Sequence, residues 1–219
     1  GLAQDQALST ADRVGGLALF CCARPLSDLV LECREVGTAK DIPVKIMPCR
    51  VQKIERVAED VIILSVKLPA NERLQFLAGQ YIEFLLKDGK RRAFSIANAP
   101  HDDGFLQLHV RMIAGGEFTG HVFGGMKEKE ILRFQGPYGS FFLREESTKP
   151  MILLAGGTGF APIKAIVEHA IHNHIKRPLE IYWGARTRSG LYLPGLPSGW
   201  AGANSYIRYV PVLSEATPQ

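Results

Sequence analysis

Short apolar runs alternate with polar residues through the middle of the chain, and turn residues separate them. Six runs follow one another: "RVQKIERV", "VIILSVKL", "QYIEFLL", "AFSIANA", "FLQLHVRM" and "EILRFQG". The connecting stretches include "DGK", "HDDG" and "AGGE". Short strands at this spacing are typical of a small antiparallel barrel. We therefore predict an antiparallel β-barrel over residues 48–147, interrupted by one short helix from Thr119 to Met126.

The pattern changes after Pro150. "MILLAGG" is a continuous apolar run, "APIKAIVEHAIHNHI" has apolar positions at helical spacing, and "LEIYWGAR" and "YIRYVPVLSE" have the character of two further strands. Strand, helix and strand of these lengths predict a parallel βαβ unit in an α/β nucleotide domain over residues 148–219. Open sheets of this kind have about five or six strands. Because only three are visible, we expect the domain to be incomplete at its C-terminal end.

The first 36 residues form a separate piece that ends in an expected strand, "SDLVLEC". Residues 37–47, "GTAKDIPVKIM", have the composition of an extended linker. A chain of 219 residues with 46% hydrophobic content suits two compact domains plus an appendage.

Charge and cysteine content narrow the setting. The 26 basic and 22 acidic residues are scattered along the chain, so no nucleic-acid partner is expected. No apolar run approaches the roughly 20 residues of a membrane span, and the start lacks a signal peptide pattern. The cysteines at 21, 22, 33 and 49 show no pairing pattern and no zinc knuckle. We expect a cytoplasmic, reduced protein with Cys22 and Cys33 as core thiols.

Histidines gather in the predicted helix after Pro150 but do not indicate a metal site. His169, His172 and His174 are spaced so that they do not share one helix face. Glu168 precedes His172 by four residues, and we expect the two to form a surface pair.

Two segments of the predicted barrel carry groups that suit a flavin dinucleotide. In "RRAFSIANAP", Arg92, Phe94 and Ser95 place a guanidinium, a flat ring and a hydroxyl on one strand. In "GGEFTGHVF", Gly116 and Thr119 open a helix whose N-terminus can bind an anion. The alternative is that Arg92 lies on a solvated strand edge and Phe94 is one ring of the core.

A glycine-rich turn, "LLAGGTGFAP", joins the first strand of the predicted nucleotide domain to its helix. Glycine lets the backbone approach the phosphates of a pyridine nucleotide closely. Glycines also occur in such turns for packing, so the turn alone leaves both interpretations open.

In these motifs the chain resembles the ferredoxin–NAD(P)H reductase superfamily, over about residues 48–219. The family's flavin motif stands here as Arg92-Ala93-Phe94-Ser95. The resemblance implies that Arg92 binds a flavin phosphate, that Phe94 packs on the isoalloxazine, and that Ser95 hydrogen-bonds near the reactive nitrogen N5. It also implies that Gly116 and Thr119 hold the FAD pyrophosphate.

The same resemblance assigns the nicotinamide site. Gly156 and Gly157 belong to the glycine turn, and Thr158 and Gly159 are expected under the nicotinamide and ribose. Ser95 and Thr158 are thus the candidate catalytic residues. The other expected nucleotide contacts are Pro162 at the first helical position, Gly184 close to the cofactor, and Arg186 near its phosphates or ribose.

The N-terminal stretch "ALFCCARPLSDLVLEC" resembles the closing segment of a plant-type ferredoxin domain. Matching Pro25, Ser27 and Asp28 makes Cys21 the fourth ligand of a two-iron two-sulfur cluster. Residues 1–20 contain no cysteine. We therefore expect a fragment, truncated at both ends, whose first 36 residues are the remnant of a β-grasp ferredoxin domain.

The function implied is an NAD(P)H-dependent flavoprotein reductase. Electrons would pass from NAD(P)H through FAD to the two-iron centre, and then to a partner oxygenase or dehydratase. Two alternatives stay open: a reductase that uses free flavin as its substrate, and a catalytically silent flavin-binding module. NADH is favoured by the resemblance, although Arg186 and Arg188 could reach the 2′-phosphate of NADPH or lie in solvent.

Overall fold

A computed structural model describes residues 9–17, 19, 26–28, 30 and 42–215. The chain divides into two compact units, Gly1–Glu35 and Val36–Gln219. In the first unit, helix α1 (Thr10–Val14) begins with a reciprocal cap, because Asp12 N–H donates to Ser9 Oγ (3.1 Å) and Ser9 N–H donates to the Asp12 carboxylate (2.9 Å). The predicted cluster ligand Cys21, the thiols Cys22 and Cys33, and most of the expected strand lie outside the described residues.

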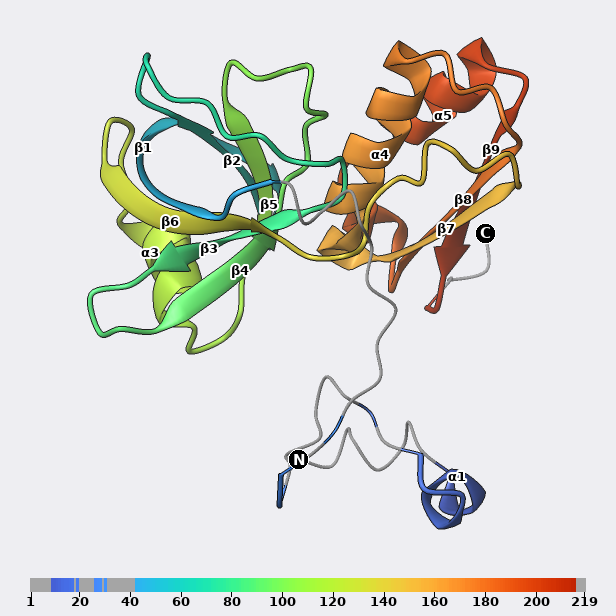
Figure 1. Ribbon diagram of the computed structural model, residues 1–219, viewed down its shortest axis with the longest axis horizontal. Helices are drawn as coiled ribbons and strands as arrows, with labels where there is room; N and C mark the ends of the chain where they lie inside the picture. The colour runs from blue at the N-terminus through green and yellow to red at the C-terminus, as the bar shows by residue number, and fades with distance from the viewer. Residues whose placement is uncertain (1–8, 18, 20–25, 29, 31–41, 216–219) are drawn as a thin grey trace. The chain divides into compact units, whose positions relative to one another are not determined.

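The second unit opens with an antiparallel barrel, as predicted (Figure 1). Its strands run in the order β4-β3-β6-β1-β2-β5. An isolated bridge between Ile96 and Leu108, with a hydrogen bond from Ala97 N–H to Gln107 O (2.7 Å), joins the two ends of this order and closes the barrel. The strands are β1 (Lys45–Ala58), β2 (Val61–Lys67), β3 (Tyr81–Leu85), β4 (Arg91–Ser95), β5 (Leu106–Arg111) and β6 (Ile131–Tyr138).

Alternation of side chains produces the barrel core. Met47, Cys49 and Val51 are buried on β1, whereas Arg50 between them is exposed. Cys49 is a free, buried thiol whose pKa is raised to about 12 by burial, which makes it an unreactive core residue.

The helix within the barrel is displaced from its predicted position. Helix α3 runs from Glu117 to Gly124, whereas the sequence predicted Thr119 to Met126. Gly116, with extended backbone, serves as its N-cap, and the helix ends where Gly124 meets a second glycine. Its buried residues, Phe118, Thr119 and Val122, are therefore those of its first two turns.

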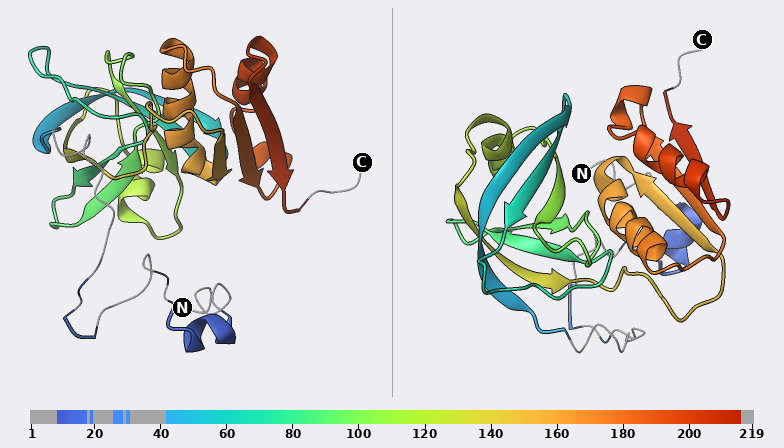
Figure 2. Two further views of the ribbon diagram at one scale, coloured as in Figure 1. Left: turned by 45° about the vertical axis from the view of Figure 1, so that its right-hand side comes forward. Right: turned by 90° about the horizontal axis from the view of Figure 1, so that it is seen from above.

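A parallel sheet in the order β7-β8-β9 follows, and this confirms the predicted α/β arrangement (Figure 2). Helix α4 ends at His172, before the predicted run is complete. The sequence did not predict α5, because its segment "GLPSGWAGA" is rich in glycine and proline. The elements are β7 (Met151–Gly156), η2 (Gly157–Gly159), α4 (Phe160–His172), β8 (Leu179–Ala185), η3 (Arg188–Gly190), α5 (Gly195–Ala203) and β9 (Ile207–Leu213).

The predicted pair of Glu168 with His172 is wrong. Glu168 instead accepts a hydrogen bond from Lys164 Nζ (2.8 Å), one turn earlier on α4. His172 stacks on His101 of the barrel, with ring centroids 3.7 Å apart. None of the described helices has the length and apolar character needed to cross a membrane.

Candidate flavin and nucleotide sites

The flavin motif lies on β4, beside the start of α3. Strand pairing places Arg92 opposite Phe84 and Phe94 opposite Ile82, so both motif residues share a strand face with core residues. Phe94 is half-buried, and its ring centroid lies 5.3 Å from Phe118 and 6.0 Å from Phe84. The ring therefore packs on the barrel core along part of its surface, as the alternative interpretation expected, and remains partly accessible to a ligand.

Arg92 presents a half-exposed guanidinium on the same strand. Among the described residues, Arg92 Nη1 donates a hydrogen bond to the Arg91 carbonyl (2.8 Å). The Nζ of Lys90, just before β4, lies 3.8 Å from Oε2 of Glu117 in the first turn of α3. Lys90 also pairs with Asp88, so two carboxylates share its charge, and Arg92 is the candidate for binding a phosphate of a dinucleotide.

The glycine turn before α3 has a shape that depends on Thr119. The buried Thr119 hydroxyl accepts a hydrogen bond from Ile113 N–H (3.2 Å) and can donate to the carbonyl of Ile113 (3.3 Å) or Gly116 (3.2 Å). A Cβ added at Gly116 would lie 2.5 Å from that hydroxyl. The structure gives Thr119 a role in closing the turn, and that Gly116 and Thr119 hold the pyrophosphate stays a prediction. The compact turn, the guanidinium and the ring fit an FAD molecule.

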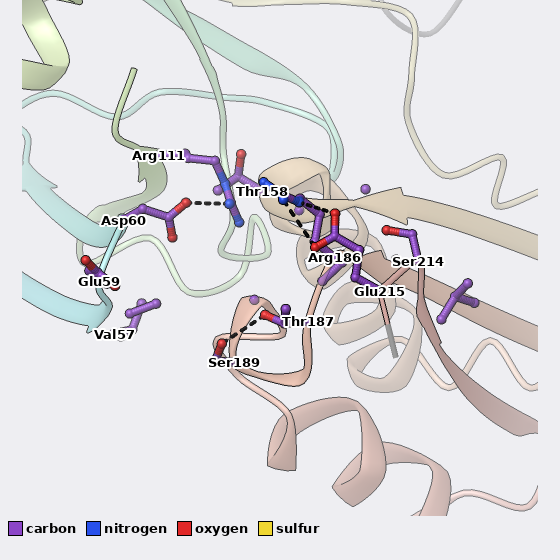
Figure 3. Close-up of a pocket in the computed structure, with 17 residues that line it drawn as sticks. Val57, Glu59, Asp60, Arg111, Thr158, Arg186, Thr187, Ser189, Ser214 and Glu215 are labelled. Carbon is purple, nitrogen blue, oxygen red and sulfur yellow. Dashed lines mark hydrogen bonds and ion pairs between the residues drawn. The ribbon is translucent and has the colours of Figure 1, made fainter. Parts of the chain in front are cut away.

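A second site is a cleft of about 1070 Å³ between the barrel and the parallel sheet (Figure 3). Gly156 of β7 pairs with Gly184 of β8, and Gly184 pairs with Val212 of β9, so the carboxyl ends of the three strands open into it. Of the predicted nucleotide residues, this cleft brings together Gly156, Gly157, Thr158, Gly184 and Arg186.

Gly157 is the constrained residue of the turn. Its φ of +52° lies in the left-handed region, and a Cβ there would lie 3.3 Å from Arg111 Nη2. Trp183 Nε1–H donates to the Gly157 carbonyl (2.9 Å) and anchors the turn to the buried core. A Cβ at Gly156 or Gly159 would meet no atom within 4 Å, which leaves that side of the turn open to a ligand.

Two predicted nucleotide residues, Gly159 and Pro162, do not line the cleft. Gly159 is exposed, and Pro162 is the third residue of α4 because the helix begins at Phe160, so its prediction as the first helical residue is wrong. Proline is tolerated there because the N–H groups of the first turn have no intrahelical acceptor. Ser95, at the end of β4, is not among the described residues that line the cleft either, whereas Thr158 is. Their joint catalytic role stays a prediction.

Arg111 and Asp60, which no sequence motif indicated, reach the cleft from the barrel. Arg111 Nη1 donates to Asp60 Oδ2 (2.5 Å). Its Nε and Nη2 are buried and have no hydrogen-bond partner among the described residues. A half-buried arginine with two buried donors free beside the glycine turn, among the residues described, is suited to an anionic ligand. A single arginine at a strand end carries no sequence signal for this role.

Arg186 is exposed at the edge of the cleft and paired with Glu215 by two hydrogen bonds (2.8 and 3.2 Å, Figure 3). This hydrogen bonding lowers the pKa of Glu215 and raises the pKa of Arg186, because it stabilises the charged form of each group. Arg188, the second candidate for a 2′-phosphate, lies in η3 and does not line the cleft.

Comparison with known proteins agrees with this geometry. Residues 48–143 match the family described as "Oxidoreductase FAD-binding domain", and residues 153–219 match "Oxidoreductase NAD-binding domain". Over 212 residues the chain is 41% identical to CDP-6-deoxy-L-threo-D-glycero-4-hexulose-3-dehydrase reductase of Yersinia pseudotuberculosis, covering 97% of this chain and 64% of that protein. It is 33% identical over 174 residues to the NAD(P)H-flavin reductase of Aliivibrio fischeri, covering 77% of this chain and 72% of that protein.

Among solved structures, the cytochrome P450 reductase GcoB of Amycolatopsis matches with a TM-score of 0.73 and 34% identity, over 95% of this chain and 64% of that one. The chain thus spans somewhat less than two thirds of the length of the Yersinia and Amycolatopsis proteins. The barrel, the parallel sheet and these matches together show that the chain belongs to the ferredoxin reductase-type oxidoreductases, which join an FAD-binding domain to an NAD-binding domain.

Proposed function

We propose that this chain is the flavin and nucleotide part of a reductase that moves electrons from NAD(P)H through FAD to a two-iron two-sulfur centre. Bound FAD can accept a hydride from a nicotinamide and release single electrons. The observation that carries the proposal is the cleft itself, because it joins the glycine turn and Gly184 of the sheet to Arg111 of the flavin barrel.

In this proposal the barrel holds FAD through the residues around β4 and α3. Arg92 binds a phosphate oxygen, and the accessible part of Phe94 lies against the isoalloxazine. Ser95 donates a hydrogen bond near N5. The turn that Thr119 closes around Gly116 presents backbone N–H groups at the start of α3 to the pyrophosphate.

The nicotinamide nucleotide binds across the cleft. Gly156 and Gly157 let its phosphates approach the backbone, and Nε and Nη2 of Arg111 donate to a phosphate oxygen. Gly184 leaves space beside the sheet, and Thr158 orients the nicotinamide ring. Holding both reactants in one orientation is the main contribution that these residues make to the rate.

We further propose that NADH is preferred over NADPH. The two hydrogen bonds to Glu215 occupy the Arg186 guanidinium and neutralise the cation nearest the strand ends. A 2′-phosphate would have to compete with the Glu215 carboxylate for Arg186. A free ribose hydroxyl, in contrast, can donate a hydrogen bond to that carboxylate.

The iron-sulfur part rests on sequence resemblance. Cys21 would be one of four thiolate ligands, with the other three supplied by a longer chain. The acceptor would be an oxygenase or a dehydratase, a proposal supported by two similar proteins, one named as the reductase of a dehydrase and the other as a cytochrome P450 reductase.

A second candidate is a reductase that treats flavin as a diffusible substrate, and the similarity to the Aliivibrio flavin reductase favours it. The two proposals differ in how tightly flavin is held. The closed turn at Gly116 and the Arg92 guanidinium on β4 favour tightly bound FAD.

Purification followed by flavin release tests the choice. We expect the protein to be yellow and to yield FAD close to one per chain, and NADH to bleach its visible absorbance under anaerobic conditions. Folded protein that retains no FAD but reduces added flavin with NADH would favour the second candidate. Bound FAD that NADH does not bleach would indicate the silent module.

A further inference from the structure

A hydrogen bond connects the barrel to the nucleotide domain at a buried position. His109 on β5 and Tyr192, in the segment between η3 and α5, are 4% and 6% exposed. The His109 Nδ1 and Tyr192 hydroxyl lie 2.8 Å apart, although the residues are 83 positions apart in the sequence. The two aromatic rings meet edge to face, with centroids 5.4 Å apart.

From Tyr192 the contacts continue to the glycine turn of the nucleotide site. The Tyr192 ring meets Trp183 edge to face with centroids 5.1 Å apart, and Trp183 stacks on Phe160 at 3.8 Å. Trp183 Nε1–H then donates to the carbonyl of Gly157 (2.9 Å). An unbroken series of buried contacts therefore links strand β5 to the backbone that lines the cleft.

The other end of this series lies next to Arg111. His109 precedes Arg111 by two residues on β5, so the two side chains project from the same strand face. On the neighbouring strand β2, Ile63 pairs with His109 and Val61 pairs with Arg111. Val61 belongs to the core of the nucleotide domain. The bond to Tyr192 therefore holds the strand that carries Arg111.

Both partners are uncharged near neutral pH. Burial, with a smaller contribution from Lys164, lowers the pKa of His109 to about 3, and burial raises the pKa of the Tyr192 hydroxyl. A neutral hydrogen bond in a buried contact is directional and weakly dependent on salt, so it suits a fixed spacing between two elements.

We propose that His109 and Tyr192 are positioning residues, whose hydrogen bond sets the distance between the glycine turn and the Arg111 guanidinium so that both can hold one dinucleotide. This inference rests on the proposed function, since it concerns the nucleotide of that same cleft. Neither residue lines the cleft, so their effect on the nucleotide passes through Trp183 and β5.

A matched pair of substitutions tests the proposal on the FAD-loaded chain. Tyr192→Phe removes the hydroxyl that bonds His109. Tyr209→Phe removes a buried hydroxyl on β9 that has no hydrogen-bond partner among the described residues, and serves as the control. Each variant is measured for FAD content, melting temperature, the dissociation constant of NAD⁺, and kcat and KM for NADH with ferricyanide.

We expect Tyr192→Phe to raise the dissociation constant of NAD⁺ and the KM for NADH by a factor of about 2 to 12, the range that one net hydrogen bond represents. FAD content and kcat should change little, and Tyr209→Phe should resemble the wild type. His109→Asn, which keeps a polar atom near the position of Nδ1, should retain more affinity for NAD⁺ than His109→Leu.

Equal NAD⁺ affinity in Tyr192→Phe and Tyr209→Phe would overturn the positioning role, even if Tyr192→Phe melts at a lower temperature. Loss of folding in both Tyr192→Phe and His109→Asn would likewise make the pair a purely structural contact. A wild-type chain that holds FAD but binds no NAD⁺ would instead overturn the proposed function, and the inference with it.

Discussion

The barrel and the parallel sheet differ in how each makes its core. The barrel closes on itself through the Ile96–Leu108 bridge, and the core residues lie inside. The sheet β7-β8-β9 buries one face against α4 and neighbouring segments, while Ile152 and Leu154 on its other face are 67% and 72% exposed. The flavin motif is therefore shaped by strand pairing within one barrel, whereas the nucleotide cleft also needs residues from outside its sheet.

The cofactor residues follow the same division. Arg92 and Phe94 are brought to α3 by neighbouring strands and by the Phe94–Phe118 contact. Gly157, in contrast, is held by Trp183 and faces Arg111 from the other domain. Variants that alter one region and leave the other unchanged test this comparison.

The largest effect is expected for a core leucine of the barrel. Leu64 is 0% exposed on β2, so Leu64→Ala should lower the free energy of unfolding by about 2–5 kcal/mol through the cavity it leaves. Leu154→Ala removes the same atoms from the exposed face of the sheet. It should change the free energy of unfolding by about 0.5 kcal/mol or less. Chemical denaturation measures both. A loss of similar size in Leu154→Ala would show that this face is covered.

Arg92→Gln and Arg111→Gln should separate the two binding sites. Losing one hydrogen bond to a charged group costs about 1.5–3 kcal/mol, which is about a 10- to 150-fold loss of affinity. Arg92→Gln should lose FAD affinity. Arg111→Gln should keep FAD and lose NAD⁺ affinity. Isothermal titration of each ligand into both variants gives the answer, and the assignment of either arginine fails if its own ligand binds unchanged.

Acid should lower the free energy of unfolding through His109, which lies at the contact between the two regions. Folded His109 has a pKa near 3, whereas the unfolded residue titrates near 6.5. Below pH 6.5 the unfolded state takes up a proton that the folded state does not, so stability is present above that pH and is lost as pH falls toward 3. At pH 5 the loss is about 2 kcal/mol. Unfolding midpoints between pH 5 and pH 7.5 should decline less in His109→Asn.

The smallest effect concerns coenzyme choice at the exposed edge of the cleft. Glu215→Gln removes the charge that pairs with Arg186 and should shift the ratio of kcat/KM values for NADH and NADPH toward NADPH. Ion pairs in solvent contribute little, so the shift should be no more than about fivefold. The control is Glu55→Gln, which removes the charge that pairs with Lys53 on the barrel and should leave the ratio unchanged. Equal ratios in both variants would remove Glu215 from the account of specificity.

The sequence by itself determined the type and order of most elements. The alternation of Cys49, Arg50 and Val51 is a local pattern typical of a strand with one buried face, although β1 begins at Lys45, within the predicted linker. The glycines at 156 and 157 likewise indicate a tight strand-to-helix turn, because few other residues adopt the φ of Gly157. These signals depend on neighbouring residues and can be read from the chain directly.

Only the tertiary structure decided which residues complete the sites. Asp60 and Arg111 are 51 positions apart, His109 and Tyr192 are 83 apart, and neither pair follows a periodic pattern. The inward turn of the Thr119 hydroxyl depends on the path of the chain at Ile113, and the start of α4 at Phe160 depends on the η2 turn before it. Such contacts form when distant segments pack together, so the buried Nε and Nη2 of Arg111 could be recognised as candidate donors only after folding had placed them beside Gly157.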